Sequence, residues 1–391
     1  MELKKGYKQT EVGVIPEDWD VKFLENISTI SRLAGAEYSS VWEEKQDGEI
    51  VALRGFNIGQ NKIIERDFVR ISNELSLKLK RSRLYEGDVV YPCVGTIGNA
   101  AVIKENDKYH IQQNIAKLTP DKKQIIPEYL AYFLMSFLGE REVERFNATS
   151  SQPNVLVGSL RQYRIPLPKV VDEQAFIANA LSDADALIQS LTRLIAKKRQ
   201  IKQGAMQTLL NPYENGRLKA GWVVTRLGNI LRVCHGKSQH EVADKNGKYP
   251  ILATSGEIGR ASKYLYDKPS VLIGRKGTID VPRYMEYPFW SIDTLFYTEI
   301  FEPNNAKYLF YQFNLIDWYS FNEASGVPSL SARTIENIEI SLPSPEKQVQ
   351  IANLLSDMDA EIAALEAKLA KYRQIKQGMM QNLLTGRIRL L

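Results

Sequence analysis

The chain has few of the residues that build disulfide frameworks and metal centres. It carries two cysteines, Cys93 and Cys234, and three histidines, His110, His235 and His240, in 391 residues. The cysteines stand at no disulfide or thiolate spacing, and the histidines complete no metal-ligand pattern. We therefore expect no metal site in this chain. Two unpaired thiols are typical of proteins in the reducing cytoplasm.

Long apolar runs are also missing. None approaches the roughly 18 residues that a membrane span requires, and the N-terminal "MELKKGYKQTEVGVIPEDW" lacks the apolar centre of a signal peptide. We therefore expect a cytoplasmic protein without a membrane partner. The formal net charge of +5 and the pI of about 8.9 permit an anionic partner such as nucleic acid without requiring one.

Motifs for catalysis are absent or incomplete. The stretch "GRKGT" (274–278) resembles a phosphate-binding loop but lacks the glycine that a GxxxxGK[ST] loop places before its lysine. Glu43 and Lys45 form an E-x-K pair of the kind found in some nucleases, yet such tripeptides are common by chance. With no nucleophile motif and no cofactor loop, we predict no catalytic residue and no cofactor bound by this chain.

What the sequence does contain is an internal repeat. "RQIKQGAMQTLL" (199–210) returns as "RQIKQGMMQNLL" (373–384), and about 23 of 38 positions agree from Gln174 and Gln348 onward. Repeats must be found first because they decide the architecture. The repeat predicts a duplicated unit.

Both copies have a helical period. Apolar residues spaced by four and three residues form a seam of the coiled-coil type. The seam residues are Ile177, Leu181, Ala184, Ile188, Leu191 and Ile195 in the first copy and Ile351, Leu355, Met358, Ile362, Leu365, Leu369 and Tyr372 in the second. Prolines at 168, 343 and 345 mark the helix starts, and each helix is expected to span about 38 residues.

Identity between the helices extends to polar positions, which a hydrophobic seam alone does not require. Asn179, Asp183 and Gln203 recur as Asn353, Asp357 and Gln377. Two amphipathic helices in unrelated cores would explain the seam only, so we favour a shared docking role. The candidate docking residues are Lys202, Gln203, Lys376 and Gln377.

The remaining sequence predicts two α+β domains with strongly bent sheets. "IPEDWDVKFLENI" (15–27) matches "KAGWVVTRLGNI" (219–230), and "SQPNVLVGSLRQYRIPLP" (151–168) matches "GVPSLSARTIENIEISLP" (326–343). "DVVYPCVG" and "SVLIGRKG" read as strands, and residues 127–146 and 305–321 as one helix each. The predicted boundaries are 1–171 for the first domain, 172–211 for the first helix, 212–345 for the second domain, and 346–391 for the second helix with the tail.

Polar, basic and glycine-rich loops recur at matching places in both domains. Arg, Lys, Gln, Asn, Ser and Thr are the side chains that contact base edges and phosphates, although ordinary solvent loops share this composition. The candidate DNA-binding residues are Arg54, Asn57, Thr96, Asn99, Gln112, Gln113, Ser151, Gln152 and Asn154 in the first domain and Thr254, Ser255, Arg260, Arg275, Lys276, Thr278, Ser329 and Arg333 in the second.

With these residues in view, the chain resembles the specificity subunit of type I restriction–modification systems. The resemblance is carried by "YKQTEVGVIPEDW" (7–19), by "IPLP…EQ…IANALSDADALI" (165–188) and its second copy, and by both "RQIKQG-MQ-LL" endings. "PILATSGEIGRASKY" (250–264) and "VLIGRKGTI" (271–279) look like part of a target-recognition domain. The resemblance covers essentially the whole chain.

The resemblance implies a fold and a function. Two target-recognition domains would each read one half of a bipartite, asymmetric site on double-stranded DNA. Two antiparallel coiled-coil helices, related by a pseudo-twofold axis, would separate the domains, set the spacer and dock two modification subunits. S-adenosylmethionine-dependent methylation would belong to those partners, as would ATP-driven cleavage where restriction subunits also join.

Two alternatives remain open. The chain could be a coiled-coil scaffold indifferent to DNA, or a methyltransferase or nuclease acting alone. The repeat also gives a geometric prediction, because "TGRIRLL" (385–391) matches the start of "NPYENGRLKAGW" (211–222) and "GVIPEDW" (13–19) matches its end. The two termini should therefore lie close together.

Overall fold

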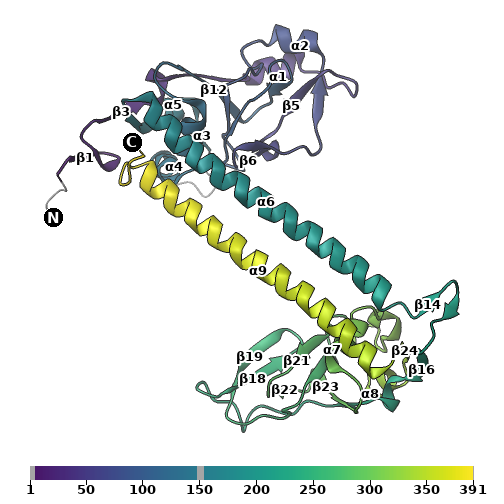
Figure 1. The fold of residues 1–391 in the computed structure, drawn as a ribbon. Coiled ribbons are helices and arrows are strands. Elements are labelled where there is room, and N and C mark those ends of the chain that lie inside the picture. Colours follow the sequence, from purple (N-terminus) through teal and green to yellow (C-terminus); the bar gives the residue numbers. More distant parts are fainter. Residues whose placement is uncertain (1–4, 148–153, 391) are drawn as a thin grey trace. The chain divides into compact units, whose positions relative to one another are not determined.

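The computed structural model describes residues 5–147 and 154–390. The chain divides into two compact units, unit 1 (Met1–Leu191 with Lys368–Leu391) and unit 2 (Thr192–Ala367). Two long helices, α6 (Val171–Leu209) and α9 (Pro345–Leu383), therefore each contribute one end to unit 1 and the other end to unit 2 (Figure 1). Both predicted helices are present, each 39 residues long.

Unit 1 combines a four-stranded antiparallel sheet, in the order β10-β9-β12-β4, with a three-stranded sheet, in the order β11-β5-β8. Strand β11 runs parallel to β5, whereas β8 runs antiparallel to it. Strand β13 pairs with β3, and β1 with β2. The strands are β1 (Tyr7–Thr10), β2 (Gly13–Pro16), β3 (Trp19–Phe23), β4 (Ser28–Arg32), β5 (Ile50–Leu53), β6 (Ile58–Gly59), β7 (Lys62–Ile63), β8 (Val69–Ile71), β9 (Val89–Pro92), β10 (Ala101–Val102), β11 (Tyr109–Ile111), β12 (Ile115–Pro120) and β13 (Arg164–Pro168).

Unit 2 repeats this plan. Its sheets have the orders β17-β23-β20-β21 and β19-β18-β22, and β22 again runs parallel to its neighbour β18. Strand β24 pairs with β16, as β13 does with β3. The strands are β14 (Tyr213–Glu214), β15 (Arg217–Leu218), β16 (Val223–Arg226), β17 (Leu231–Cys234), β18 (Tyr249–Ala253), β19 (Gly256–Ala261), β20 (Ser270–Gly274), β21 (Arg283–Met285), β22 (Trp290–Ser291), β23 (Leu295–Ile300) and β24 (Glu339–Leu342).

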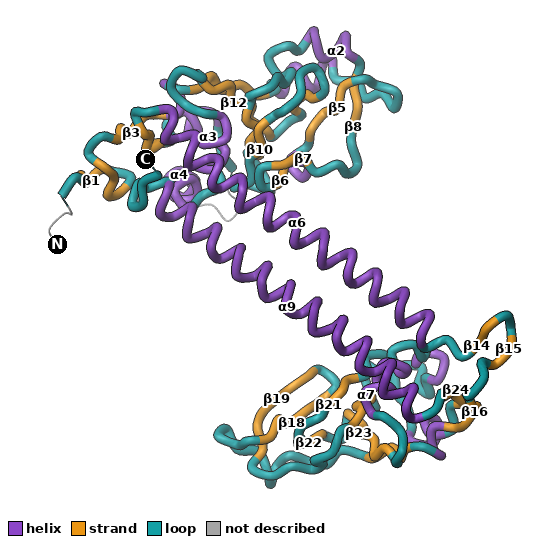
Figure 2. The backbone as a smooth tube through the Cα atoms, viewed as in Figure 1, coloured by secondary structure: helices purple, strands orange, loops and turns teal. Residues whose placement is uncertain are grey.

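The short helices accompany the sheets in both units (Figure 2). They are α1 (Gly35–Val41), α2 (Asn73–Lys78), α3 (Pro127–Leu134), α4 (Phe137–Asn147) and α5 (Val157–Arg161) in unit 1, and α7 (Ala306–Phe313) and α8 (Ala332–Glu336) in unit 2. The α+β class and the duplication are thereby confirmed. No helix among the described residues is long and apolar enough to cross a membrane.

The single helix predicted over 127–146 is wrong, because the chain breaks it between α3 and α4. The Ser136 hydroxyl donates to the Phe133 carbonyl at 2.7 Å and accepts from the Leu138 amide at 3.2 Å. Ser136 thus ends one helix and caps the next.

The helix predicted over 305–321 also stops early, at Phe313. Buried Trp318 folds back, and its indole nitrogen donates to the Phe313 carbonyl at 3.0 Å. That bond satisfies a carbonyl that the end of α7 leaves without an intrahelical donor. A short 3₁₀ helix, Trp318–Phe321, follows.

A separate hydrophobic core in each unit holds the ends of the long helices. In unit 1, Ile177 and Leu181 of α6 and Leu383 of α9 join the cluster around Trp19 and α3. In unit 2, Ile351 and Leu355 of α9 join the cluster around Trp318 and α7. Burying one such side chain stabilises the folded unit by about 2 kcal/mol relative to leaving it exposed, so the cores fix the helix ends firmly.

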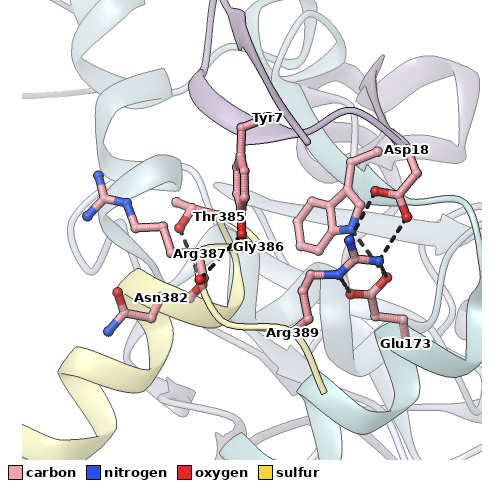
Figure 3. Close-up of polar contacts among 9 residues, drawn as sticks. Tyr7, Asp18, Glu173, Asn382, Thr385, Gly386, Arg387 and Arg389 are labelled. Atoms are coloured by element: carbon pink, nitrogen blue, oxygen red, sulfur yellow. Dashed lines mark hydrogen bonds and ion pairs between the residues drawn. The ribbon is translucent and has the colours of Figure 1, made fainter. Parts of the chain in front are cut away.

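The segments near the two chain ends lie side by side in unit 1, as predicted, although Met1 and Leu391 fall outside the described residues. Figure 3 shows Arg389 between Asp18 and Glu173. Its guanidinium pairs with Asp18 at 2.8 Å and also with Glu173. The Tyr7 hydroxyl donates to the Gly386 carbonyl at 3.0 Å.

Candidate nucleic-acid interface

Four loops meet in unit 1, and we call them loop site 1: residues 53–57, 93–99, 112–114 and 154–155. The Gln112 amide donates to the Leu53 carbonyl at 3.0 Å, and the Cys93 amide to the Asn114 carbonyl at 2.7 Å. The Val155 amide donates to the Cys93 carbonyl at 2.8 Å. Backbone bonds thus hold together loops that come from four separate parts of the sequence.

The same arrangement recurs in unit 2 as loop site 2: residues 252–256, 275–278, 292–294 and 328–330. The Ile292 amide donates to the Leu252 carbonyl at 3.0 Å, and the Arg275 amide to the Thr294 carbonyl at 2.9 Å. The Leu330 amide donates to the Arg275 carbonyl at 2.9 Å. Each bond has its counterpart in loop site 1.

A glycine turn shapes both sites in the same way. Gly95 and Gly277 have φ of 78° and 86°, which L residues with side chains rarely adopt. Immediately before each glycine, a single β-bridge joins Val94 to Asn154 and Lys276 to Ser329. The two sites therefore share one backbone plan and differ in side chains.

Among the residues predicted in the first domain, Asn57 is a correction. It is fully buried, and its side chain accepts from the Arg54 amide and donates to the carbonyls of Ile64 and Arg66. Those bonds stabilise the 54–66 loop and leave no atom for DNA. Arg54 itself is half-buried, lies over the Phe56 ring and donates to the Asp67 carbonyl.

The other predicted residues of loop site 1 are at least partly exposed. Thr96 donates to the Gly55 carbonyl at 2.9 Å, and Asn99 donates to the Ile58 carbonyl at 3.1 Å. Gln112 lies 3.4 Å from a Glu44 oxygen. Gln113 and Asn154 also belong to loop site 1. The other two residues predicted in the first domain, Ser151 and Gln152, lie outside the described residues.

Loop site 2 brings together six of the eight residues predicted in the second domain. They are Thr254, Ser255, Arg275, Lys276, Thr278 and Ser329. Ser255, Lys276 and Thr278 are exposed, and no side-chain bond to another described residue engages them. Arg275 donates to the Asp293 carbonyl at 3.1 Å.

The other two predicted residues of unit 2 lie outside this cluster. Arg260 is at the far end of β19 from the turn and pairs with Glu257 at 3.1 Å. Arg333 is exposed on α8, three residues after the Leu330 bond that closes the site.

Loop site 1 contains one cysteine, Cys93, and His110 lies two residues before its third segment. Cys93 is buried, and burial raises the pKa of its thiol to about 11, so it stays protonated at neutral pH. His110 is also buried, and burial lowers the pKa of its imidazole. No group of three or more potential metal ligands occurs among the residues that the structure describes.

A lysine–aspartate–tyrosine cluster holds the long helices together in unit 1. Lys376 of α9 lies 2.6 Å from Asp185 of α6, and the Tyr132 hydroxyl of α3 donates to the same carboxylate at 2.9 Å. The ammonium also lies 5.6 Å from the Tyr132 ring centre. Burial and the nearby carboxylate raise the pKa of Tyr132, so the phenol remains a donor.

Unit 2 repeats the cluster with the helices exchanged. Lys202 of α6 pairs with Asp359 of α9, and the Tyr311 hydroxyl of α7 donates to that carboxylate at 2.7 Å. The Lys202 ammonium lies 5.4 Å from the Tyr311 ring centre. Lys198 and Glu361, 2.6 Å apart, join the same antiparallel pairing.

These contacts give Lys202 and Lys376 a role inside the chain that the sequence prediction did not include. Their predicted role in docking remains a prediction. Gln203 and Gln377 are exposed and make no side-chain hydrogen bond to other described residues. The tyrosines were missed, although "EYLAYF" and "KYLFYQ" repeat a Y-L-x-Y pattern that could have identified them.

A cavity of about 1000 Å³ opens in unit 1 beside the repeated segment. Five identical residues of the repeat line it from α9: Arg373, Lys376, Gln377, Met380 and Gln381. The cavity is also lined by Asn99 of loop site 1 and by Glu140 and Glu144 of α4. The repeated helix face and the end of a DNA-candidate loop therefore border one cavity.

Two copies of one α+β unit, each carrying a four-loop polar site and joined to a long helix, define a duplicated recognition protein. The chain belongs to the family of type I restriction modification DNA specificity domains, whose model matches residues 16–203 and 219–376. The resemblance to type I specificity subunits inferred from the sequence is thereby confirmed.

Individual relatives agree with this assignment. The chain is 25% identical to the putative type I restriction enzyme MjaX specificity subunit of Methanocaldococcus jannaschii, over 99% of this chain and 97% of that one. The S subunit of a type I system from M. genitalium has the same fold, with a TM-score of 0.66, 16% identity and 98% of both chains covered. A chain from a structure on complex assembly and conformational transition of the type I system has a TM-score of 0.60 at 17% identity, covering 96% of this chain and 99% of that one.

Proposed function

We propose that this chain gives a type I restriction–modification complex its DNA specificity, with each loop site reading one half of a bipartite, asymmetric site on double-stranded DNA. The observation that carries the proposal is the pair of loop sites, which share backbone bonds and differ in side chains. A common backbone suits a common task, namely approach to a DNA groove. Different side chains suit different sequences.

Docking of two modification subunits is the second part of the proposal. Exposed polar residues recur on both helices without a side-chain bond to other described residues: Asn179, Asp183 and Gln203, with their counterparts Asn353, Asp357 and Gln377. Internal structure does not require this identity, whereas two copies of one partner would. The cavity shared by Gln377 and Asn99 would place such a partner beside loop site 1.

Catalysis is assigned to the partners. The modification subunits would bind S-adenosylmethionine and methylate the site, and restriction subunits, where present, would use ATP to drive cleavage. The helices of this chain would fix the spacing between half-sites. We place the assembly in the cytoplasm.

The decisive experiment expresses the chain with its methyltransferase partner in cells lacking other methylases, followed by long-read methylome sequencing. We expect a bipartite motif with a fixed, unread spacer. The purified complex should also bind a duplex carrying that motif with a steep dependence on salt, because phosphate contacts release counterions. Absence of any methylated motif in an assembled, catalytically active complex would overturn the proposal.

The two alternatives have their own signatures. A scaffold indifferent to DNA would assemble with the partner yet show no salt-dependent gel shift. An enzyme acting alone would bind S-adenosylmethionine, or cut DNA, as the isolated chain. Calorimetry with S-adenosylmethionine on the isolated chain should give no heat of binding if the partners carry the cofactor.

A further inference from the structure

One pair of equivalent residues in the two loop sites differs sharply in chemistry. The loop after β9 reads Cys-Val-Gly-Thr (93–96), and the loop after β20 reads Arg-Lys-Gly-Thr (275–278). Glycine and threonine are shared. The residue before the glycine is Val94 in unit 1 and Lys276 in unit 2.

The backbone places these two residues in the same position. Val94 bridges to Asn154 and Lys276 bridges to Ser329, in each case with the last segment of the loop site along the sequence. The positive-φ glycine comes next in both loops. Any difference in what the two loop sites contact at this point therefore comes from the side chains.

Val94 is an apolar residue exposed within a polar site. Its exposure is 39%, while its neighbours in the loop, Thr96 and Asn99, bond to the adjoining segments. An isolated exposed valine needs no explanation on an ordinary surface. In a polar site proposed to face a DNA groove, its methyl groups match one feature of the major groove, the C5-methyl group of thymine.

Lys276 presents a cation at the equivalent point. It is exposed, and no carboxylate among the described residues pairs with its ammonium. The nearby Arg275 donates to the Asp293 carbonyl at 3.1 Å, whereas Lys276 is a cation of the loop whose side chain bonds to no other described residue. In the major groove, O6 and N7 of guanine are the acceptors that a lysine selects.

We propose that Val94 and Lys276 are specificity-determining residues of the two loop sites. Val94 contacts the C5-methyl group of a thymine in one half-site, and Lys276 donates to O6 or N7 of a guanine in the other. This inference rests on the proposed function and deepens it.

The test of Lys276 uses the full chain assembled with its methyltransferase. Lys276→Met keeps most of the side-chain length and removes the charge. Lys268→Met is the matched control, because Lys268 is exposed and precedes β20 whereas Lys276 follows it. We expect Lys276→Met to lower the preference for guanine at one position of one half-site by about 5-fold to 100-fold. The control should leave the motif unchanged.

Two outcomes would overturn the assignment of Lys276. An unchanged methylated motif would show that it contacts no base. A uniform weakening on all sequences, with the salt slope reduced by about 1, would make it a phosphate contact.

The test of Val94 replaces thymine by uracil, one position at a time, in the half-site read by unit 1. Loss of one contacting methyl group should weaken binding by the unsubstituted complex about fourfold at one position. Val94→Ala should largely abolish that sensitivity to uracil. Leu77→Ala, at another exposed apolar residue on α2, is the control and should retain the sensitivity to uracil.

Failure here is distinguishable from failure of the proposed function. If the unsubstituted complex yields a bipartite motif, but Val94→Ala keeps the full uracil penalty or no thymine responds, only the assignment of Val94 falls. If the unsubstituted complex methylates no defined motif, the proposed function falls as well.

Discussion

Units 1 and 2 hold their long helices with the same residues and present different residues in their loops. Tyr132, Asp185 and Lys376 in unit 1 are matched by Tyr311, Asp359 and Lys202 in unit 2. In the loops, Val94 stands where Lys276 stands, on the same backbone. The comparison separates what must stay equal in a duplicated protein from what is free to change.

The equality of the helices has a geometric cause. Each helix carries an aspartate followed 17 residues later by a lysine. In an antiparallel pair, the aspartate of one helix therefore faces the lysine of the other, in both units. Changing one copy alone would break a pair, so internal pairing explains identity at Asp185 and Lys202 without a partner. The exposed pair Gln203 and Gln377 is not explained in this way.

The glutamines near the starts of the two long helices, Gln174 and Gln348, are identical in the two copies for a similar reason. Buried Gln174 accepts from the Ile126 amide at 3.0 Å, and buried Gln348 accepts from the Asn305 amide at 3.0 Å. These two backbone amides lie at the starts of α3 and α7, where the first N–H groups of a helix have no intrahelical partner. The same side chain thus ties a long helix to a short one in both units.

The largest expected effect comes from exchanging one unit's recognition region. Replacing residues 212–342 with the second domain of another family member should replace one half of the methylated motif and leave the other half unchanged. The expectation follows because each loop site is built from backbone bonds within its own unit. Methylome sequencing measures it, and a change in both halves would show that the units do not read independently.

Lengthening both helices tests what they share. Seven residues inserted after Leu191 and seven after Leu365 keep the seam in register, because seven residues form one heptad. Each insertion adds about 10 Å of helix, equal to about three base pairs of DNA. We expect the unread spacer to grow by about one to three base pairs, since the helix axis need not parallel the DNA. An active complex with an unchanged spacer would mean that the helices do not set it.

Removing the two equivalent lysines one at a time compares the clusters directly. The Lys376 side chain is 10% exposed and its Asp185 partner 15%, against 22% and 42% for Lys202 and Asp359. Lys376→Met should therefore lower the free energy of unfolding by about 3 kcal/mol, as loss of a buried ion-pair partner does. Lys202→Met should cost about 1 kcal/mol or less, because water screens the more exposed pair.

Urea denaturation, with hydrogen–deuterium exchange to separate the units, measures both effects. The control exchanges the partners, in Asp185→Lys combined with Lys376→Asp, and should recover part of the loss. Equal losses for the two single variants would show that exposure does not decide the strength of these pairs.

Much of this organisation could be predicted from the sequence, because the repeat and the helical period are local signals. Glycines and polar residues mark the loops that meet in both sites, so the sequence could locate these loops, while their role in DNA binding remains a prediction. Asn57 could not be distinguished from a DNA-reading residue, because its burial depends on bonds to Ile64 and Arg66 that only the folded loop creates. Tyr132 and Asp185 were missed because their contact joins separate helices.

The last comparison concerns how each unit connects a long helix to its first strands. In unit 2 the peptide chain itself leads from α6 through residues 210–222 into β16. In unit 1 the corresponding junction between α9 and β3 is not covalent. Arg389 makes ion pairs there with Asp18 and with Glu173, whose side chain is 2% exposed.

Arg389→Ala should therefore destabilise unit 1 by about 2 kcal/mol and leave unit 2 unaffected, because it removes the cation that faces a buried carboxylate. Arg387→Ala is the matched control, since only the Arg387 backbone carbonyl takes part in the Tyr7 contact.

The hydrogen bond from Arg389 lowers the pKa of Asp18 below its ordinary 3.8. A carboxylate with a lowered pKa in the folded state contributes stability above its ordinary pKa, and that contribution is lost as pH falls through the folded value. The gap in stability between the unsubstituted chain and Arg389→Ala should thus be constant near neutral pH and shrink below about pH 4. A gap that widened on acidification would show that Arg389 acts through something other than these carboxylates.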